Sequence, residues 1–466
     1  MATLSPLDRL MPRGYVRQML CFPSTHPDVS RVLRVGLAGV IADLPYLLSG
    51  LVVSDDLRQI SLSPAYQGLK DLYSEQDLQG AIDYAAMKED CFPPSAFTVP
   101  GIVPPDTQPP LPNPAPVFRA KLSLVKGGYV LCVAVHHCTT DIAGFGAILK
   151  IWASHCRTGA AAAVGFDPTW MDREALMGRP DIDHRTAPTS IPELLHVRGP
   201  DDFTRLTISK SRPSNLVTSI FFFPQKALQA LKHAVNEHIV SQGIAGWAST
   251  SDILTALLWS ALLAAEQDPR ARVGSNNTIG FPVNFRPRFN PPLPSDYLGA
   301  AFVMTTATIS QKDLISFATN ASSPSDDVPL NPTSISRLSK IASTIRTSIH
   351  HINEESVQEV LMYLDAVSDD HPPITLGPRH DGISIVSWAD QSIYELDWGD
   401  VVGRCEAVRL PKLMYKRYPI VLPKILAGIN GSEGGFEVIV SFDRQVLERF
   451  GQSWLIKRFA TLMCYS

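Results

Sequence analysis

Residues 128–143 read Gly-Tyr-Val-Leu-Cys-Val-Ala-Val-His-His-Cys-Thr-Thr-Asp-Ile-Ala, the most informative stretch of the sequence. From Tyr129 to Val135 the chain is apolar without interruption, which is typical of a strand that is buried on both faces. The run ends at two histidines, and Asp141 follows where the apolar spacing becomes helical. Titratable side chains at the junction of a buried strand and a helix indicate a candidate site.

His137 and Asp141 suit acid–base chemistry. A neutral imidazole, whose pKa lies near neutrality, can take a proton from a hydroxyl or an amine. An acidic residue four positions later can orient the imidazole directly or by holding an arginine. The alternative is that both histidines are core residues bonded to backbone carbonyls, because a His-x-x-x-Asp pattern is short enough to arise by chance.

The flanking segments predict a mixed α/β or α+β fold. A glycine pair at 127–128 separates the strand from Phe118–Leu124, which alternates apolar and polar residues, so a hairpin is expected. Helical spacing is seen over Val32–Leu44, where Pro45 stops it, and over Ala143–Trp152. In the second half, strands are expected at 217–223, 277–283, 300–308, 383–388, 407–410 and 436–442, and helices at 225–239, 251–264, 335–364 and from Arg444 onward.

Composition excludes several function classes. The 466 residues are 45% hydrophobic with a net charge of −4, so there is no basic surface for nucleic acid or for an anionic membrane. Seven scattered cysteines without a CxxC pair indicate neither a disulfide framework nor a metal site. The N-terminus lacks a secretory apolar core, and the most apolar stretch, 32–53, is interrupted by charges and Pro45. We expect a cytoplasmic protein without membrane insertion.

Ten prolines fall between Pro93 and Pro116. Proline removes a backbone donor and restrains the residue before it, so this stretch predicts neither a helix nor a central strand. We interpret it as an extended connector or a surface loop. A ligand for SH3-type domains is less favoured, because no Arg or Lys flanks the segment before Arg119.

Common nucleotide and hydrolase motifs are missing. The chain has no GxGxxG after a strand, no GxxxxGK[ST] and no GxSxG, which argues against nicotinamide enzymes, P-loop NTPases and α/β-hydrolases.

The remaining motifs, taken in order, resemble the BAHD family of acyl-CoA-dependent acyltransferases, in particular its fungal branch near the trichothecene 3-O-acetyltransferases. The resemblance covers nearly the whole chain. It rests on Leu4–Asp8, Leu33–Leu48, the HHxxxD of His136–Asp141, Ser251–Trp259, the Asp-x-Arg-like Asn284–Arg286, and Asp397–Gly403, a variant of DFGWG.

This resemblance implies two chloramphenicol-acetyltransferase-like domains with an active-site tunnel between them. The N-terminal domain would cover 1–195, a crossover linker 196–215 and the C-terminal domain 216–466, with part of about 365–400 packing against the N-terminal domain. Acyl-CoA would enter as a co-substrate from one face and a small-molecule alcohol from the other, with no permanent cofactor. We expect a monomer.

The resemblance also implies roles for single residues. His137 would be the general base of direct acyl transfer. Two carboxylates accompany it in the catalytic motifs: Asp141, paired with Arg286, and Asp397, which we interpret as an anchor of the second motif. Further structural or tunnel positions are Gly144, Trp398 and Gly399, and Ser251 and Asp252 are expected to contact CoA.

Departures from the family pattern leave alternatives open. Ile142 stands where the family often has Gly, and Asp400 stands where it usually has Trp, so Asp400 either faces solvent or opposes a developing oxyanion. One alternative is a stand-alone condensation-like domain that takes its acyl group from a carrier protein. Another is a catalytically silent paralogue that binds CoA or another ligand.

Overall fold

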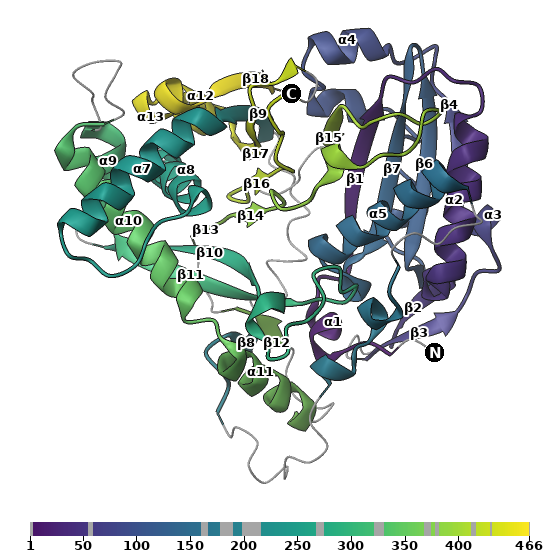
Figure 1. Cartoon of the computed structure of the whole chain (residues 1–466), viewed down its shortest axis with the longest axis horizontal. Helices are drawn as coiled ribbons and strands as arrows, with labels where there is room; N and C mark the ends of the chain where they lie inside the picture. Colours follow the sequence, from purple (N-terminus) through teal and green to yellow (C-terminus); the bar gives the residue numbers. More distant parts are fainter. Residues whose placement is uncertain are drawn as a thin grey trace.

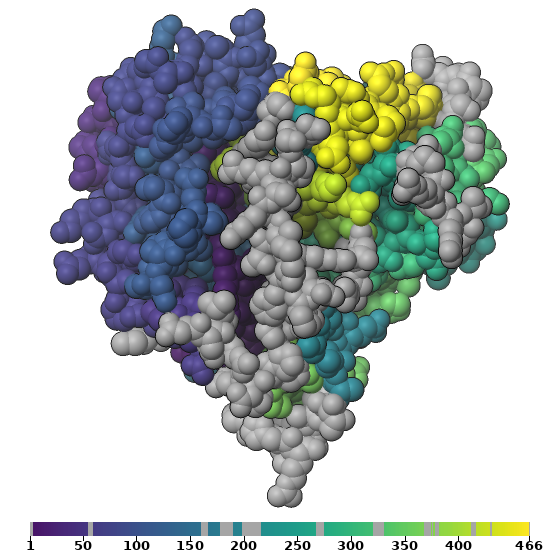
Figure 2. All heavy atoms as spheres, turned by 180° about the vertical axis from the view of Figure 1, so that it is seen from behind, coloured from purple at the N-terminus to yellow at the C-terminus, as the bar shows by residue number. Residues whose placement is uncertain are grey.

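The computed structural model shows two mixed α/β halves side by side (Figure 1). It describes residues 3–54, 59–159, 166–177, 190–197, 216–266, 275–320, 330–367, 374–377, 382–411, 416–428 and 431–465. Most of the predicted crossover linker, 198–215, lies outside the described residues. Seen from behind, the purple and blue first half and the green to yellow second half lie side by side and touch near the top of the view (Figure 2).

The first half is built on a five-stranded sheet. Its strands, in spatial order, are β15 (Ala407–Arg409), β1 (Tyr15–Phe22), β7 (Gly128–His136), β6 (Phe118–Val125) and β4 (Tyr73–Asp77). Helices α2 (Val29–Asp43) and α5 (Ile142–Thr158) cover one face (Figure 1). All nine residues of β7 are buried. The central strand that carries the histidines at its end is therefore enclosed on both faces, as its apolar run predicts.

The proline-rich segment covers the other face of this sheet. It forms short 3-10 turns, η2 (Pro94–Thr98) and η3 (Pro105–Thr107), and ends in the edge strand β5 (Ala115–Pro116). Arg119 donates to Asp106 at 2.7 Å, and Arg17 donates to the carbonyl of Thr107 at 3.5 Å. The segment is thus an ordered connector bound to the sheet. The remaining small elements of this half are α1 (Pro6–Leu10), α3 (Leu69–Leu72), α4 (Tyr84–Glu89), β2 (Ser49–Val53) and β3 (Ile60–Pro64).

The second half has two main sheets and one two-stranded pair. The strands of the first sheet are, in spatial order, β14 (Val386–Ser387), β16 (Ile420–Val421), β17 (Gly435–Asp443), β9 (Leu216–Pro224) and β18 (Thr461–Tyr465). Those of the second are β11 (Phe302–Ser310), β10 (Asn276–Asn284) and β13 (Ile383–Ser384). The two-stranded pair consists of β12 (Ile374–Leu376) and β8 (Leu195–Val197). Its helices are α7 (Gln225–Ser241), α8 (Thr250–Glu266), α9 (Gln311–Asn320), α10 (Pro332–His350), α11 (Glu354–Ala366), α12 (Arg444–Gln452) and α13 (Trp454–Phe459). Apolar α8 lies at the centre of their common core.

Late in the sequence the chain returns to the first half. Tyr394 and Trp398 are buried in the core beside α2 and α5, and β15 pairs antiparallel with β1. The return runs over 393–409, so it includes the end of the expected range of about 365–400 and extends beyond it. The strands at 374–387 belong to the sheets of the second half: β12 pairs with β8, β13 with β10, and β14 with β16.

Most predicted elements are present, but one helix prediction is wrong. The helix expected over 335–364 is two helices, α10 and α11, because Asn353 caps a new helix by accepting from the backbone N–H of Ser356 at 2.8 Å. The prediction also missed β1 and β18, whose neighbours are distant in sequence. Within the described residues, no helix is long and apolar enough to cross a membrane, and no cluster of side chains could hold a metal ion.

A buried ion pair joins the sheets of the two halves. Arg409 of β15 donates to both carboxylate oxygens of Glu437 in β17, at 2.6 and 2.8 Å, and both side chains are almost fully buried. Arg409 also donates to the carbonyls of Cys91 and Phe92. Removing one partner of such a pair leaves an uncompensated charge in the interior, which is far costlier than removing both.

We therefore expect Glu437→Gln to lower the free energy of unfolding by about 3–5 kcal/mol. Urea denaturation followed by circular dichroism measures this change. The double variant Arg409→Met/Glu437→Leu should recover much of the loss, because no charge is then left unpaired. A single variant as stable as the native protein would contradict this account of the junction.

Candidate active site

His137 lies in a tight turn directly after β7. The turn, η4 (His137–Thr139), is attached to the N-terminal segment by a hydrogen bond from the backbone N–H of His137 to the carbonyl of Gly14, at 2.8 Å. The imidazole is partly exposed, and its centroid lies 6.2 Å from the ring of Phe302 at the start of β11. The histidine of the first half thus faces a strand of the second half.

The surroundings of His137 favour its neutral form. Burial lowers the pKa of the imidazole below its usual value of 6.5, and this effect outweighs the opposing influence of the His137 and Thr140 carbonyls and of Asp141. Nδ1 is buried without a hydrogen-bond partner in the described part of the chain. A neutral, partly accessible imidazole can accept a proton at neutral pH.

The neighbours of His137 are unsuited to chemistry. His136 is only 1% exposed, its Nδ1 accepts from the backbone N–H of Cys138 at 3.3 Å, and burial lowers its pKa to about 4. Burial raises the pKa of the Cys138 thiol to about 12, and its Sγ donates to the carbonyl of Met11 at 3.4 Å. A thiol that stays protonated is a poor nucleophile. Of these three residues, only His137 is partly exposed.

Asp141 binds across the junction of the two halves. Its carboxylate accepts two hydrogen bonds from the guanidinium of Arg286, both at 2.8 Å, and both side chains are nearly fully buried. Arg286 also donates to the carbonyls of Tyr297 and Gly299, at 2.8 and 3.0 Å. This pair, which the resemblance implied, attaches the start of α5 to the segment that leads into β11.

The same carboxylate caps α5. It accepts from the backbone N–H groups of Ala143 and Gly144, at 3.1 and 3.0 Å, and from that of Ala301 in the other half, at 2.9 Å. Burial alone would raise the pKa of Asp141, but the charge and hydrogen bonds of Arg286 lower it below its usual range. Asp141 therefore stays ionised, and both of its carboxylate oxygens are bound within the protein.

Gly144 is required by close packing at this junction. A Cβ added there would lie 2.2 Å from Oγ1 of Thr140 and 2.9 Å from the carbonyl oxygen of Leu298. The absence of a side chain lets α5 approach the segment from the second half.

The structure does not bring the second motif to His137. Asp397 is half-exposed, accepts from the backbone N–H of Gly399 at 3.0 Å, and lies 3.7 Å from Arg157. Trp398 is fully buried, with its ring 5.7 Å from that of Trp152. Since Trp152 is ten residues along α5 from Ile142, this motif lies about 15 Å along the helix from the histidine turn.

Asp397 thus lies away from the histidine turn, where we expected an anchor rather than a base, and Trp398 and Gly399 lie beside it. Gly399 has φ +83°, a left-handed conformation that glycine adopts without strain, in a turn that packs against the end of α5. Asp400 is exposed to solvent, so its carboxylate does not oppose charge that develops at His137. The motif anchors the returning chain to the first half.

Ser251 and Asp252, expected to contact CoA, lie at the start of α8. Asp252 is buried, accepts from the hydroxyl of Ser249 at 2.9 Å, and forms an ion pair with Arg346 of α10. The side chain of Ser251 is exposed. Trp247 is half-exposed, and the guanidinium carbon of Arg346 lies 4.3 Å from its ring centroid. The Asp252 carboxylate thus binds Ser249 and Arg346, whereas the side chains of Ser251 and Trp247 are accessible to solvent.

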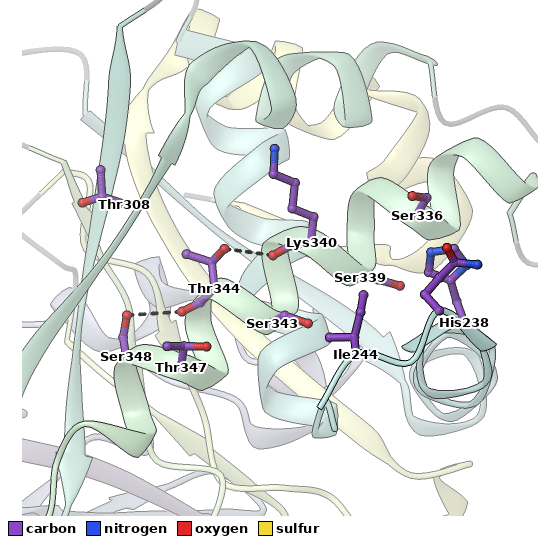
Figure 3. Close-up of a pocket in the computed structure, with 11 residues that line it drawn as sticks. His238, Ile244, Thr308, Ser336, Ser339, Lys340, Ser343, Thr344, Thr347 and Ser348 are labelled. Atoms are coloured by element: carbon purple, nitrogen blue, oxygen red, sulfur yellow. Dashed lines mark hydrogen bonds between the residues drawn. The ribbon is translucent and has the colours of Figure 1, made fainter. Parts of the chain in front are cut away.

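A hollow of about 690 Å³ lies beside this group (Figure 3). Hydroxyl side chains of α10 form one wall, with Lys340 among them, and Ile244 and His238 lie on the opposite side. Thr308, near the end of β11, also lines it. Sequence reasoning missed this hollow and also Phe302, because the residues concerned come from separate elements without a shared motif.

The comparisons with known proteins agree with this architecture. A model of the Transferase family matches residues 2–454. The chain is 25% identical to the O-acetyltransferase ptmV of Penicillium ochrochloron, over 96% of this chain and 94% of that protein. It is also 25% identical to the communesin N16 acyltransferase cnsK of Penicillium expansum, over 90% and 89%.

Among solved structures, the chain resembles F. graminearum TRI101 in complex with coenzyme A and deoxynivalenol. The TM-score is 0.76 with 19% identity, and the alignment covers 99% of both chains. That likeness establishes the fold, and the family model spans both the histidine turn and the ion pair of Asp141 with Arg286. The chain therefore belongs to the Transferase family and is an acyltransferase of the BAHD type.

Proposed function

We propose that this enzyme transfers a short acyl group, such as acetyl, from a coenzyme A thioester to a hydroxyl of a fungal secondary metabolite, with His137 as the general base. The observation that carries the proposal is the partly exposed, neutral imidazole of His137 at the junction of the two halves. Curated relatives named O-acetyltransferases support the reaction class.

The reaction needs only one proton carrier. His137 takes the proton of the acceptor hydroxyl as its oxygen attacks the thioester carbonyl carbon. The tetrahedral intermediate then collapses, the C–S bond breaks, and the imidazolium returns the proton to the departing thiolate of CoA. Transfer would be direct, because Cys138 is buried and protonated and so offers no covalent intermediate.

For acyl-CoA, the strand β11 offers a path away from His137. Phe302, at its start, faces the histidine, and Thr308, six residues later, lines the hollow beside α10. At a strand's rise per residue this separation is about 20 Å, comparable to an extended pantetheine arm. The thioester would lie at His137 and the nucleotide in the hollow.

The charges around the hollow support the same orientation. Lys340 lines it, and Arg346 lies on the same helix beneath Trp247. Both cations have a carboxylate neighbour: Lys340 donates to Asp313 at 2.7 Å, and Arg346 pairs with Asp252. Phosphate groups would add to these pairs from the open side, and the exposed indole would offer a face to adenine.

Replacing His137 by alanine should lower the turnover by roughly 10²–10⁴-fold, because the proton then has no positioned acceptor. The assay combines acetyl-CoA or longer acyl-CoAs with a panel of alcohols, and measures released thiol and the mass of the product. Cys138→Ser, which keeps a donor to the carbonyl of Met11, should retain most of the activity.

Two results of this assay would overturn the assignment. Unchanged turnover in His137→Ala would remove the histidine from its role. Transfer only from a phosphopantetheinyl carrier protein, and never from free acyl-CoA, would favour the condensation-like alternative.

The pH dependence follows from the lowered pKa of His137. The base must be neutral to act, so kcat/KM should fall as the pH drops through the pKa of the imidazole, below its usual 6.5. Activity should therefore persist at mildly acidic pH. A pH–rate profile between pH 4.5 and 8.5 tests this, and an acidic limb centred above 6.5 would contradict the buried, neutral histidine.

Lys340→Glu tests where the nucleotide lies. Reversing this charge should raise KM for acetyl-CoA about tenfold, corresponding to about 1.4 kcal/mol of lost binding, with little change in kcat. KM for acetyl-pantetheine, which lacks the nucleotide, should not change. Lys126→Glu is the matched control, because Lys126 forms a similar exposed pair with Asp83 in the first half. Equal effects on both thioesters would place the nucleotide elsewhere.

A further inference from the structure

The N-terminal segment, residues 4–14, contacts the histidine turn directly. The carbonyl of Gly14 accepts from the backbone N–H of His137, and that of Met11 accepts from Sγ of Cys138. In Figure 1, α1 lies at the lower end of the junction between the halves. Two consecutive residues of the turn are therefore held by the N-terminal segment.

Asp8, in α1, is a fully buried carboxylate at the centre of this segment. One oxygen accepts from the backbone N–H of Ser5 and from Nε of Arg173, both at 2.9 Å. The other oxygen accepts from the backbone N–H of Ala300, at 2.8 Å, which belongs to the second half. Asp8 thus caps its own segment at Ser5, forms an ion pair with Arg173 and accepts a hydrogen bond from the second half.

Arg173 connects this carboxylate to the histidine turn. Its second terminal nitrogen donates to the carbonyl of Thr139 at 2.9 Å, and its guanidinium packs 5.7 Å from the ring centroid of Tyr46. Burial would lower the pKa of the Arg173 guanidinium, but Asp8 raises it, so the guanidinium stays charged. A continuous set of hydrogen bonds runs from Thr139 through Arg173 and Asp8 to Ala300.

The Asp8 and Asp141 pairs hold adjacent residues of the same segment. Asp8 accepts from the N–H of Ala300, and Asp141 accepts from the N–H of Ala301. The next residue is Phe302, whose ring faces His137. Each carboxylate pairs with its own buried arginine, Arg173 for Asp8 and Arg286 for Asp141. Each carboxylate also connects the first half to the residues just before β11.

We propose that Asp8 is a positioning residue for acyl transfer, which together with Arg173 forms a second clamp that sets His137 against the start of β11. This inference rests on the proposed function of His137. The clamp acts on both sides of the reacting centre at once, because Arg173 holds the turn and Asp8 holds Ala300. Losing it would let the imidazole and β11 shift relative to each other, and a displacement of about 1 Å can cost roughly 10²-fold in rate.

Asp8→Asn is the sharpest test, because the amide keeps the size of the side chain and an acceptor for Ala300, yet cannot neutralise Arg173. Asp43→Asn is the matched control. Asp43 also pairs a buried partner in the first half, with its Oδ2 2.7 Å from Nε2 of His155. His155 lies 13 residues along α5 from Ile142, about 20 Å from the histidine turn.

We expect Asp8→Asn to lower kcat about 10- to 100-fold, with KM for acyl-CoA changed less than about threefold, because positioning rather than binding is lost. The acidic limb of the pH profile should move toward pH 6.5 as water gains access to His137. Asp43→Asn should lower the melting temperature without changing kcat or the pH profile. If Asp8→Asn behaves like Asp43→Asn, the clamp is only structural and the inference fails.

Hydrogen exchange provides a readout that does not depend on activity. In Asp8→Asn, peptides covering 137–141 and 297–302 should exchange faster than in the native protein, while in Asp43→Asn they should not. Unchanged exchange at both segments would overturn the clamp even if no acyl-CoA proves to be a substrate. Failure of every acyl-CoA with native enzyme, together with increased exchange, would overturn the proposed function and retain the clamp.

Discussion

The buried pair of Asp141 and Arg286 is the interaction on which the rest of the site depends. One carboxylate caps α5, binds the guanidinium through both oxygens and accepts the N–H of Ala301. The cap of α5 is local, whereas Arg286 and Ala301 belong to the second half, so the same carboxylate serves the helix after the histidine and the contact between the halves. The site and the interface between the halves are therefore one structure.

Buried ion pairs recur wherever the halves meet. Asp141–Arg286 and Arg409–Glu437 each connect the two halves, while Asp8–Arg173 lies within the first half and binds the second through Ala300. All three pairs are nearly or fully buried. Such pairs add little net stability over apolar packing, since desolvation offsets their attraction. Their geometry is nonetheless exacting, because a shift of either half would leave a charge unpaired. For this enzyme they define how the two halves are aligned, and His137 lies where that alignment matters.

Local patterns predicted the elements that lie within continuous segments. The hairpin of β6 and β7 and helices α2, α5, α7 and α8 follow from apolar periodicity and turn residues, and the structure confirms them. The break between α10 and α11 was missed because the cap at Asn353 is a single polar residue inside an amphipathic pattern. Strands β1 and β18 were missed because a strand is stabilised by its neighbours, and those of β1 are β7 and the distant β15.

The family and a candidate base could be recognised from local patterns, namely the ordered motifs and the uninterrupted apolar strand that leads into His136–Asp141, because such patterns need no tertiary contacts. The charged groups around His137 could be identified only in the folded chain. Asp397 and Trp398 fall beyond the first turns of α5, and Asp400 faces solvent. Asp8, which the sequence offered only as part of an N-terminal motif, meets Arg173, which in turn contacts the histidine turn. The physical reason is that a buried charge acquires its role from its partners, and here those partners are brought together only when the two halves pack.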